Sequence, residues 1–565
     1  MAAGLLVALA QTSAAQNRDA EFGKLADQYF NELVFHFDPV AGTSAGFHQY
    51  DSLLPSSSRA EIEAQIAALH KWQAEVEGFD ARGLSPWVSA DRDLMLANIR
   101  GSLLNLEAIR GWEKNPDNYS SGITNAIFVI MSRSYAPAAE RLRSVIARER
   151  LTPMVFQSAR ANLKNPPRIY TEVALEQLPG LISFFEHDVP LAFQQVKDTQ
   201  LLGEFQRSNQ AVIAGLRAYG DWLKSSLLPR SHGDFRIGAE NYRNKLLYDE
   251  MVDVPLDRLL QIGFDDLHRN QAEFKRVAAQ IDPKRPPQQI LDELERDHPP
   301  ADKLLQAFRD VLGSLRNFIE VHHIVMIPSP VPPILEESPP FMRALTTASM
   351  DTPGPYEKDK EAFFNVTLPD SRWPAKEKEE YLEGLNRGTI VSTATHEAYP
   401  GHYVQFLWVQ GLPTKVRKLI GCGSSAEGWA HYSEQMMLDQ GYGNGDLKLR
   451  LGQLQDALLR DARYIVGIQM HTGRMTFEQA LDFFVKEGYQ TRPMAEKEAK
   501  RGTSDPTYLV YTLGKLEILK LREDYRKAKG SQFSLEEFHN AFMKQGTPPI
   551  KIVRRALLGN DSPVL

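Results

Sequence analysis

The sequence predicts a mainly α-helical protein with a small β element in its second half. Three observations support this fold class: helical periodicity runs through most of the chain, strand-like alternation is scarce, and prolines gather between residues 324 and 370. The composition, 42% hydrophobic and 24% charged over 565 residues, is typical of a globular protein. No fixed-period repeat is present in the sequence, which argues against a solenoid.

Amphipathic segments separated by short polar or proline-containing breaks extend from about residue 18 to residue 279. Two of them carry clear apolar stripes, one after the capping serines at 56–58 and one after Pro255. The stripes consist of Ile62, Ile66, Leu69, Trp72 and Val76, and of Leu256, Leu260, Phe264, Leu267 and Phe274. Spacings of three and four place each set on one helical face, so we expect helices packed on helices.

The proline-rich stretch 324–370 interrupts this pattern, because helices do not accommodate so many prolines. Residues 341–348 and 361–368 are its best strand candidates and predict a small sheet or hairpin. An exposed strand edge can bind an extended peptide as an additional strand. The alternative interpretation is a surface hairpin that only packs.

The first 16 residues resemble a secretory signal, with an apolar run at 4–10 followed by small residues at 13–15. The run is well short of the roughly 20 residues that a membrane helix needs. We therefore expect an exported protein, periplasmic or secreted, without stable membrane insertion once the signal is removed. No Lys or Arg precedes the run, so a truncated start and an ordinary N-terminal helix are the alternatives.

The net charge and the cysteine content exclude some classes of partner and of metal site. A net charge of -7 provides no basic field for a phosphate backbone, which argues against nucleic acid as a partner. The single cysteine, Cys422, excludes an internal disulfide and a cysteine-rich metal site. A metal would need histidine and carboxylate ligands.

The residues best suited to bind a metal and catalyse a reaction lie in the sequence H-E-A-Y-P-G-H, which begins at His396. In a common zinc-hydrolase arrangement, two histidines four residues apart bind the metal and the intervening Glu is the general base. Here the two histidines are six residues apart. In a straight helix six residues span a rotation of roughly 600°, so His402 would point about 120° away from His396. Because Pro400 disrupts a helix and Gly401 allows it to bend, we predict a kink that turns both imidazoles toward one ion. The alternative is a Pro-Gly turn that ends a helix, with incidental histidines.

A third ligand is expected on a following helix. Glu427, His431 and Glu434 recur at i, i+4 and i+7 and share one helical face. We favour Glu427 as the ligand, with His431 and Glu434 as residues that orient the ligands. The competing interpretation of Glu427 is a capping box with Ser424.

The H-E-A-Y-P-G-H motif, followed by E-G-W-A-H-Y-S-E, resembles the bacterial domain of unknown function 885, and the likeness covers most of the chain from about residue 230. That group is predominantly helical and similar in character to zinc metallopeptidases of the carboxypeptidase type. The resemblance implies a multi-helix, metallopeptidase-like architecture with the β element beside the active-site helix. It also implies His396, His402 and Glu427 as metal ligands and Glu397 as the catalytic base.

Further site residues follow from the chemistry of peptide hydrolysis. A tetrahedral oxyanion needs a donor, for which Tyr508 and Tyr511 are candidates, although either would equally serve as a core aromatic. Arg463 or His471 would bind the carboxylate of a substrate trimmed at its C-terminus. Members of the group often carry Asp four residues before the position of His471, where this chain has Gly467.

The sequence therefore predicts a metallopeptidase with one zinc ion per chain, a carboxypeptidase or oligopeptidase that acts on peptides or small amides. The alternatives are a zinc amidase or esterase for non-peptide substrates and a non-catalytic binding protein, against which the intact Glu397 counts. The expected regions are a signal peptide at 1–16, an N-terminal helical region at 17–230, and a catalytic region at 231–565 that contains the β element.

Overall fold

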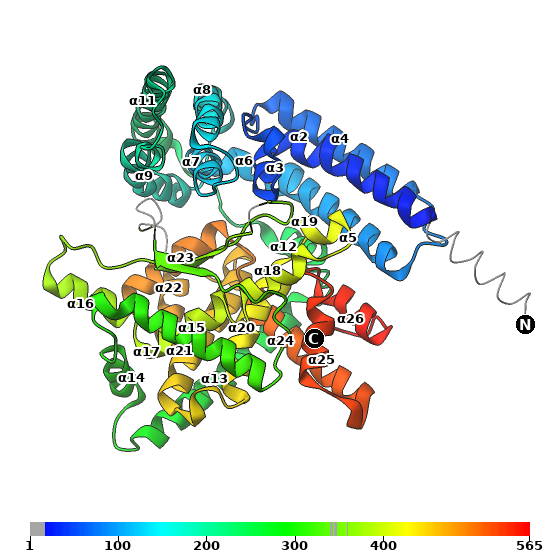
Figure 1. Cartoon of the computed structure of the whole chain (residues 1–565), viewed down its shortest axis with the longest axis vertical. Helices are drawn as coiled ribbons and strands as arrows, with labels where there is room; N and C mark the ends of the chain where they lie inside the picture. Colours follow the sequence, from blue (N-terminus) through cyan, green and yellow to red (C-terminus); the bar gives the residue numbers. More distant parts are fainter. Residues whose placement is uncertain (1–16, 339–342, 344–346, 359) are drawn as a thin grey trace, which may run out of the picture. The chain divides into compact units, whose positions relative to one another are not determined.

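The computed structural model describes residues 17–338, 343, 347–358 and 360–565 (Figure 1). These residues are mainly helical, which confirms the predicted fold class. The segment expected to be a signal peptide lies outside the described residues. The chain divides into two compact units. An N-terminal unit ends at Phe235 and also takes in Pro353–Lys360 and Pro413–Ile420, and a C-terminal unit comprises Arg236–Thr352, Glu361–Leu412 and Gly421–Leu565.

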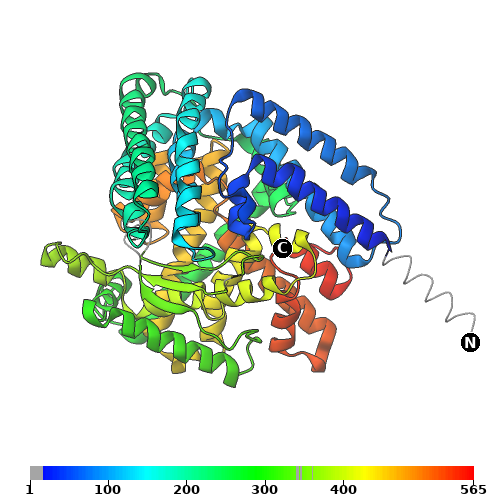
Figure 2. The same ribbon diagram turned by 45° about the horizontal axis from the view of Figure 1, so that its top comes forward.

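The N-terminal unit is a helical assembly in which α8 and α11 run alongside each other (Figures 1 and 2). On α4, Ile62, Leu69, Trp72 and Val76 are buried as predicted, while Ile66 of the same stripe is half-buried. Ser58 caps the helix by accepting from the Glu61 N–H. The described residues 17–28 are helical, and the α-helices that follow in this unit are α2 (Phe35–Phe37), α3 (Pro39–Ala45), α4 (Arg59–Gly78), α5 (Pro86–Leu103), α6 (Gly111–Lys114), α7 (Asp117–Met131), α8 (Ala138–Asn162), α9 (Arg168–Ser183), α10 (Val189–Ala192), α11 (Thr199–Trp222) and α19 (Lys415–Leu419). Its π and 3₁₀ turns are η1 (Tyr29–Val34), η2 (His48–Tyr50), η3 (Leu104–Ile109), η4 (Phe184–Asp188), η5 (Leu223–Leu227) and η6 (Leu228–Arg230).

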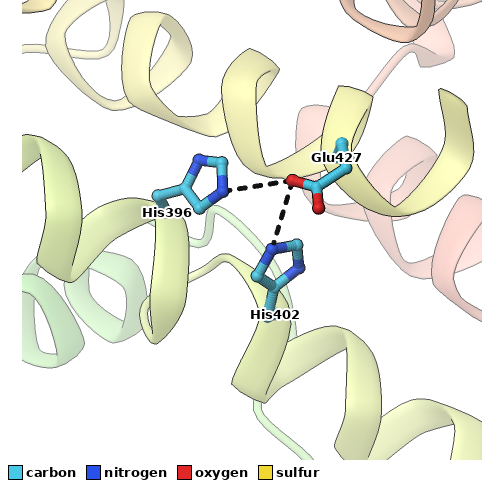
Figure 3. Close-up of side chains that lie close together, drawn as sticks. All are labelled: His396, His402 and Glu427. Carbon is cyan, nitrogen blue, oxygen red and sulfur yellow. Dashed lines mark ion pairs between the residues drawn. The ribbon is translucent and has the colours of Figure 1, made fainter. Parts of the chain in front are cut away.

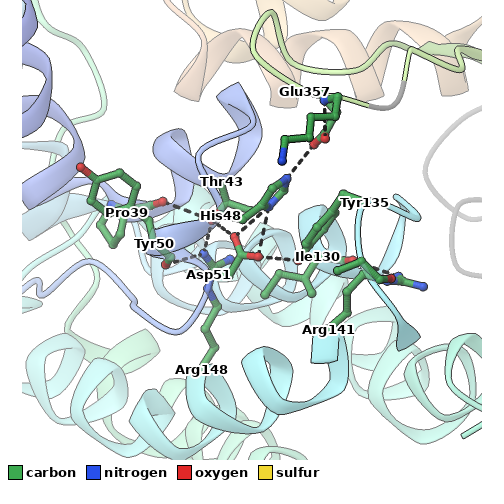
Figure 4. Close-up of polar contacts among 12 residues, drawn as sticks. Pro39, Thr43, His48, Tyr50, Asp51, Ile130, Tyr135, Arg141, Arg148 and Glu357 are labelled. Carbon is green, nitrogen blue, oxygen red and sulfur yellow. Dashed lines mark hydrogen bonds and ion pairs between the residues drawn. The ribbon is translucent and has the colours of Figure 1, made fainter. Parts of the chain in front are cut away.

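A polar cluster around His48 anchors the segment Pro353–Lys360 within the N-terminal unit (Figure 4). The His48 ring stacks on Tyr135, with 3.5 Å between ring centroids, and its Nε2 lies 2.9 Å from Glu357 Oε2. Its Nδ1 lies 3.1 Å from Asp51 Oδ2, which also accepts from the Tyr135 hydroxyl at 2.5 Å. The two carboxylates raise the pKa of His48 against the opposing effect of burial. His48 therefore has a structural role in holding this segment.

The C-terminal unit contains two extensively packed helix pairs, α20 with α24 and α13 with α21. Of the second predicted stripe, Leu260, Leu267 and Phe274 are buried on α13, while Leu256 and Phe264 are half-buried. The α-helices of this unit are α12 (Gly238–Asp249), α13 (Leu256–Ile281), α14 (Pro287–Glu295), α15 (Leu304–Val321), α16 (Ala375–Glu383), α17 (Arg387–Glu397), α18 (His402–Gln410), α20 (Gly423–Asp439), α21 (Leu447–His471), α22 (Phe477–Lys486), α23 (Arg492–Ser504), α24 (Val510–Lys529), α25 (Leu535–Met543) and α26 (Ile550–Leu558). Its 3₁₀ turns are η7 (Ala301–Lys303), η9 (Tyr442–Gly445) and η10 (Gly530–Gln532).

The β element is a three-stranded sheet of β1 (Ile334–Glu337), β2 (Ala348–Asp351) and β3 (Phe363–Val366), in the order β1-β3-β2. β3 lies inside the predicted strand 361–368 and pairs antiparallel with β2, whereas the parallel partner β1 was not predicted. The candidate at 341–348 falls largely outside the described residues, and β2 begins at its last residue.

One face of the sheet packs against α15. Phe364 and Val366 of β3 are fully buried in one core cluster with the α15 stripe, and the rings of Phe308 and Phe364 are 5.5 Å apart. This stripe consists of Leu304, Phe308, Leu312, Leu315 and Ile319. Because α15 also packs on α17, the sheet and the motif helix share one support.

Candidate metal centre

The motif lies on two helices rather than on one kinked helix. α17 ends at Glu397 and α18 begins at His402. Pro400 has no N–H to continue the helix, and the Gly401 N–H donates to the Thr395 carbonyl at 3.0 Å. A side chain at Gly401 would place its Cβ 1.7 Å from the His396 carbonyl oxygen, so the close turn requires glycine. The predicted bend is therefore a complete break, which reorients His402 relative to His396.

The break brings the two imidazoles together with Glu427 of α20 (Figure 3). Nε2 of His396 and Nε2 of His402 lie 3.3 Å and 3.5 Å from Glu427 Oε2, and the two rings are 4.9 Å apart. One potential ligand atom from each residue lies within 4.8 Å of the others, and this is the single such group among the residues that the structure describes. The three sequence-predicted ligands thus converge on one point.

Glu427 does not act as a helix cap. α20 begins at Gly423 without a side-chain cap, and the N–H groups of Gly423 and Ser424 donate instead to the Glu250 carboxylate at 3.2 Å and 3.0 Å. The capping-box interpretation of Glu427 is therefore wrong. α20 also packs closely on α24 at Gly428, where a Cβ would lie only 2.4 Å from the Gly514 Cα. Gly514 also lies against the Ser424 carbonyl, so both helices need glycine at this crossing.

The donor set fits a divalent metal. Glu427 Oε2 is buried without a hydrogen-bond partner and faces two imidazole nitrogens. Burial disfavours the charged form of His396, yet Glu427 and Glu434 raise its pKa to about 10. Burial likewise opposes ionisation of Glu427, but the two histidines hold its pKa well below the usual range. The cluster therefore favours a bound positive charge, and two imidazoles with one carboxylate are suitable ligands for zinc.

A second layer of contacts fixes the orientation of His396. Its Nδ1 lies 2.7 Å from Glu434 Oε1, which also accepts from Arg460 at 2.9 Å. The other Glu434 oxygen lies 3.1 Å from Nδ1 of His431, whose pKa burial lowers to about 3. When the Nδ1–H of His396 donates a hydrogen bond to Glu434, Nε2 carries no proton and its lone pair points toward Glu427. Glu434 and His431 thus occupy the orienting positions that the sequence predicted.

Glu397 links the motif to the sheet. Its Oε2 accepts from the Met350 N–H at 3.2 Å, and Met350 belongs to β2, an edge strand of the described sheet. In the antiparallel register Met350 is opposite Phe364 of β3, and its N–H points away from β3. The carboxylate after His396 therefore lies at the outer edge of β2.

The two tyrosines predicted as oxyanion donors occupy different environments. The Tyr511 ring is half-buried and stacks on His396, with 6.3 Å between centroids. Tyr508 is 1% exposed and packs against Gly467, where a Cβ would lie 3.0 Å from its ring. The structure therefore places Tyr511 beside the ligands and makes Tyr508 a core aromatic.

The two residues predicted to bind a substrate carboxylate have other partners. Arg463 forms two hydrogen bonds with Glu498, at 2.7 Å and 2.8 Å, in a buried pair. His471 is 1% exposed, and its Nε2 lies 2.7 Å from the Gly502 carbonyl oxygen. Arg501 was not predicted, although its guanidinium lies 6.0 Å from the Tyr511 ring. Its i,i+4 spacing to Asp505 was the available sequence signal.

Comparison with known proteins identifies a family match over most of the chain. Residues 39–557 match the family described as "Bacterial protein of unknown function (DUF885)". No curated protein matches the chain. Among the helices that the structure describes, none is both long enough and apolar enough to span a membrane.

Two solved structures, each described as a "putative lipoprotein", are similar over nearly their entire lengths. The protein from Shewanella oneidensis, of unknown function, is 27% identical, with a TM-score of 0.80 over 95% of this chain and 99% of that chain. The protein from Colwellia psychrerythraea is 17% identical, with a TM-score of 0.81 over 96% of this chain and 98% of that one, and shows the fold alone. Because the family match spans nearly all of the residues between 39 and the C-terminus, the chain belongs to the DUF885 family of bacterial proteins.

Proposed function

We propose that this protein is a zinc-dependent hydrolase that cleaves peptide bonds. The observation that carries the proposal is the convergence of His396, His402 and Glu427 on one point, with Glu397 next to the first ligand in sequence. When bound, zinc polarises a carbonyl group and lowers the pKa of a bound water toward about 7. The two imidazoles and the Glu427 carboxylate would hold the ion.

The residues around the ligands supply the remaining steps. Glu397 accepts a proton from the attacking water while the water oxygen bonds to the peptide carbonyl carbon, and it then donates that proton to the leaving amine as the C–N bond breaks. Tyr511 would donate a hydrogen bond to the developing oxyanion, a role that its stacking on His396 supports. Glu434 and Arg460 keep His396 in one orientation throughout.

The position of β2 favours a peptide over other amides or esters. A substrate strand that pairs with the outer edge of β2 would lie next to Glu397, because the Met350 N–H at that edge already contacts this carboxylate. A small non-peptide substrate has no use for a strand edge. The proposal therefore specifies an extended peptide, processed by a carboxypeptidase or an oligopeptidase.

Zinc content and peptide cleavage together test the proposal. We expect about one zinc per chain, by plasma mass spectrometry, in the wild type and in Glu397→Gln, and little zinc in His396→Ala. Glu397→Gln and His396→Ala should not cleave a peptide library, whereas the wild type should, and a chelator should abolish its cleavage. His268→Ala, an exposed histidine on α13, is the matched control and should retain both properties.

Two results would contradict this function. Wild-type protein that binds no zinc after supplementation would favour a metal-free binding protein. Zinc-loaded protein that hydrolyses small esters or amides but no peptide would favour the amidase or esterase alternative.

We also propose that the protein is exported. The apolar N-terminal stretch has signal-like features, and both similar structures carry the description "putative lipoprotein". Fractionation of cells that express the full chain should recover it outside the cytoplasm, and recovery in the cytoplasmic fraction would refute export.

A further inference from the structure

Three arginines lie against the ring of Tyr511, which itself stacks on the metal-ligand candidate His396. Their guanidinium carbons are 5.2 Å (Arg463), 5.8 Å (Arg460) and 6.0 Å (Arg501) from the centre of that ring. A guanidinium so close to a hydrolytic centre can bind a carboxylate of the substrate through paired hydrogen bonds.

Two of the three arginines are held by buried carboxylates. Arg460 donates to Glu434 at 2.9 Å, and its side chain is 12% exposed. Arg463 donates twice to Glu498, and its side chain is 11% exposed. A substrate that drew either guanidinium away would leave a buried carboxylate without its partner, which is strongly unfavourable. Neither arginine is therefore available to a substrate.

Arg501 differs from both in exposure and in partner. Its side chain is 40% exposed, and its Nε and one terminal nitrogen donate to a single oxygen of Asp505, at 3.2 Å and 3.1 Å. Asp505 is itself 41% exposed and one helical turn further along the chain. Exposed pairs of this kind contribute little stability, so an incoming carboxylate can take the place of Asp505. Arg501 also forms a hydrogen bond with Tyr511, which connects it to the candidate metal centre.

We propose that Arg501 binds a carboxylate of the substrate, and that Asp505 holds the guanidinium until the substrate arrives. The inference rests on the proposed peptidase function and adds a specificity to it: the peptide carries a carboxylate close to the bond that is cleaved. A free C-terminus and an acidic side chain offer this same group. A free C-terminus would make the enzyme a carboxypeptidase.

Peptide binding to a catalytically silent protein tests this specificity without relying on turnover. In the Glu397→Gln background, fluorescence anisotropy would measure the Kd of three labelled peptides. Two share one sequence and end in a free acid or in an amide, and the third is the amide with its last residue replaced by Glu. We expect the free acid to bind about 10- to 100-fold more tightly than the plain amide, as for loss of a charge-assisted hydrogen bond. Tight binding of the Glu-containing amide would identify an acidic side chain as the source of the carboxylate.

Two substitutions should shift this preference in opposite directions. Arg501→Gln should abolish the difference between acid and amide, whereas Asp505→Asn should enlarge it by removing the competing carboxylate. Lys497→Gln, an exposed position one turn earlier on α23, removes the same charge and should leave the preference unchanged.

The inference is overturned if the unsubstituted background binds all three peptides equally, or if Arg501→Gln retains the preference for the acid. Cleavage of the free acid by the wild type is measured separately. Arg501-dependent binding without any cleavage would refute the proposed hydrolase and leave the carboxylate site standing.

Discussion

The buried carboxylate of Glu149 should make the protein less stable as the pH rises. Glu149 lies on α8 and is 1% exposed, and its partner is the Ser208 hydroxyl, which donates to one of its oxygens. The second oxygen has no hydrogen-bond partner among the described residues. Burial raises the pKa of this group from 4.5 to about 8, so the folded protein keeps it protonated at neutral pH.

The sign of the effect follows from proton binding. Between pH 4.5 and pH 8 the folded state holds a proton that the unfolded chain has released, so stability falls through this window, by at most about 5 kcal/mol. Glu149→Gln replaces the protonated acid with a neutral group of the same shape, and its carbonyl oxygen can still accept from Ser208. The variant should match the wild type near pH 5 and be more stable by several kcal/mol at pH 8.5.

Thermal unfolding of both proteins across pH 5 to 9 measures this difference. Glu140→Gln, at an exposed position on the same helix, controls for the loss of one acidic residue. A difference in melting temperature between Glu149→Gln and the wild type that stays constant with pH would refute the reasoning, because Glu149 would then carry the same charge in the folded and unfolded states.

Two further predictions concern pairs of charged groups. Glu434→Gln removes the anionic acceptor of His396 Nδ1 and should weaken zinc binding about 10- to 100-fold, as measured by competition with a chelator. Unchanged zinc affinity in a folded variant would show that Glu434 does not orient His396. Arg417→Met leaves Asp91 buried without its ion-pair partner, since the Arg417 Nε lies 2.5 Å from Asp91 Oδ1 and both side chains are 1% exposed. The substitution should lower the free energy of unfolding in urea by about 3–5 kcal/mol, most of which Asp91→Leu should restore in the double variant. A double variant no more stable than Arg417→Met would contradict this explanation.

Features set by neighbouring residues in the chain were predictable from the sequence. The apolar stripe of α4 and its Ser58 cap follow from local spacing, and so does the interruption at Pro400. The partners of polar side chains depend instead on distant segments. Arg463 is held by Glu498, 35 residues away, so its pattern in the sequence gave no sign that it was unavailable to a substrate.

The choice between ligand and cap for Glu427 shows the same limit. Ser424 and Glu427 have the spacing of a capping box, so the preference for Glu427 as a ligand rests on the need of the metal for a third ligand and not on this local pattern. The question is decided by Glu250, which lies more than 170 residues earlier and accepts from the first N–H groups of α20. Because the distant Glu250 carboxylate accepts from the N–H groups at the start of α20, Glu427 does not cap the helix and instead faces the two histidines.

The break in the motif is also connected to the helix that carries the third ligand. The Pro400 carbonyl accepts from Nε1 of Trp429 at 2.8 Å, and the Gln405 side chain donates to the Ser425 carbonyl at 3.0 Å. Both partners lie on α20, two residues on either side of Glu427. A straight helix through 396–402 would turn His402 away from His396 and give the Pro400 carbonyl an intrahelical partner. The Pro-Gly break thus does two things at once: it reorients His402, and it frees a carbonyl that binds α20 at the position where Glu427 meets both imidazoles.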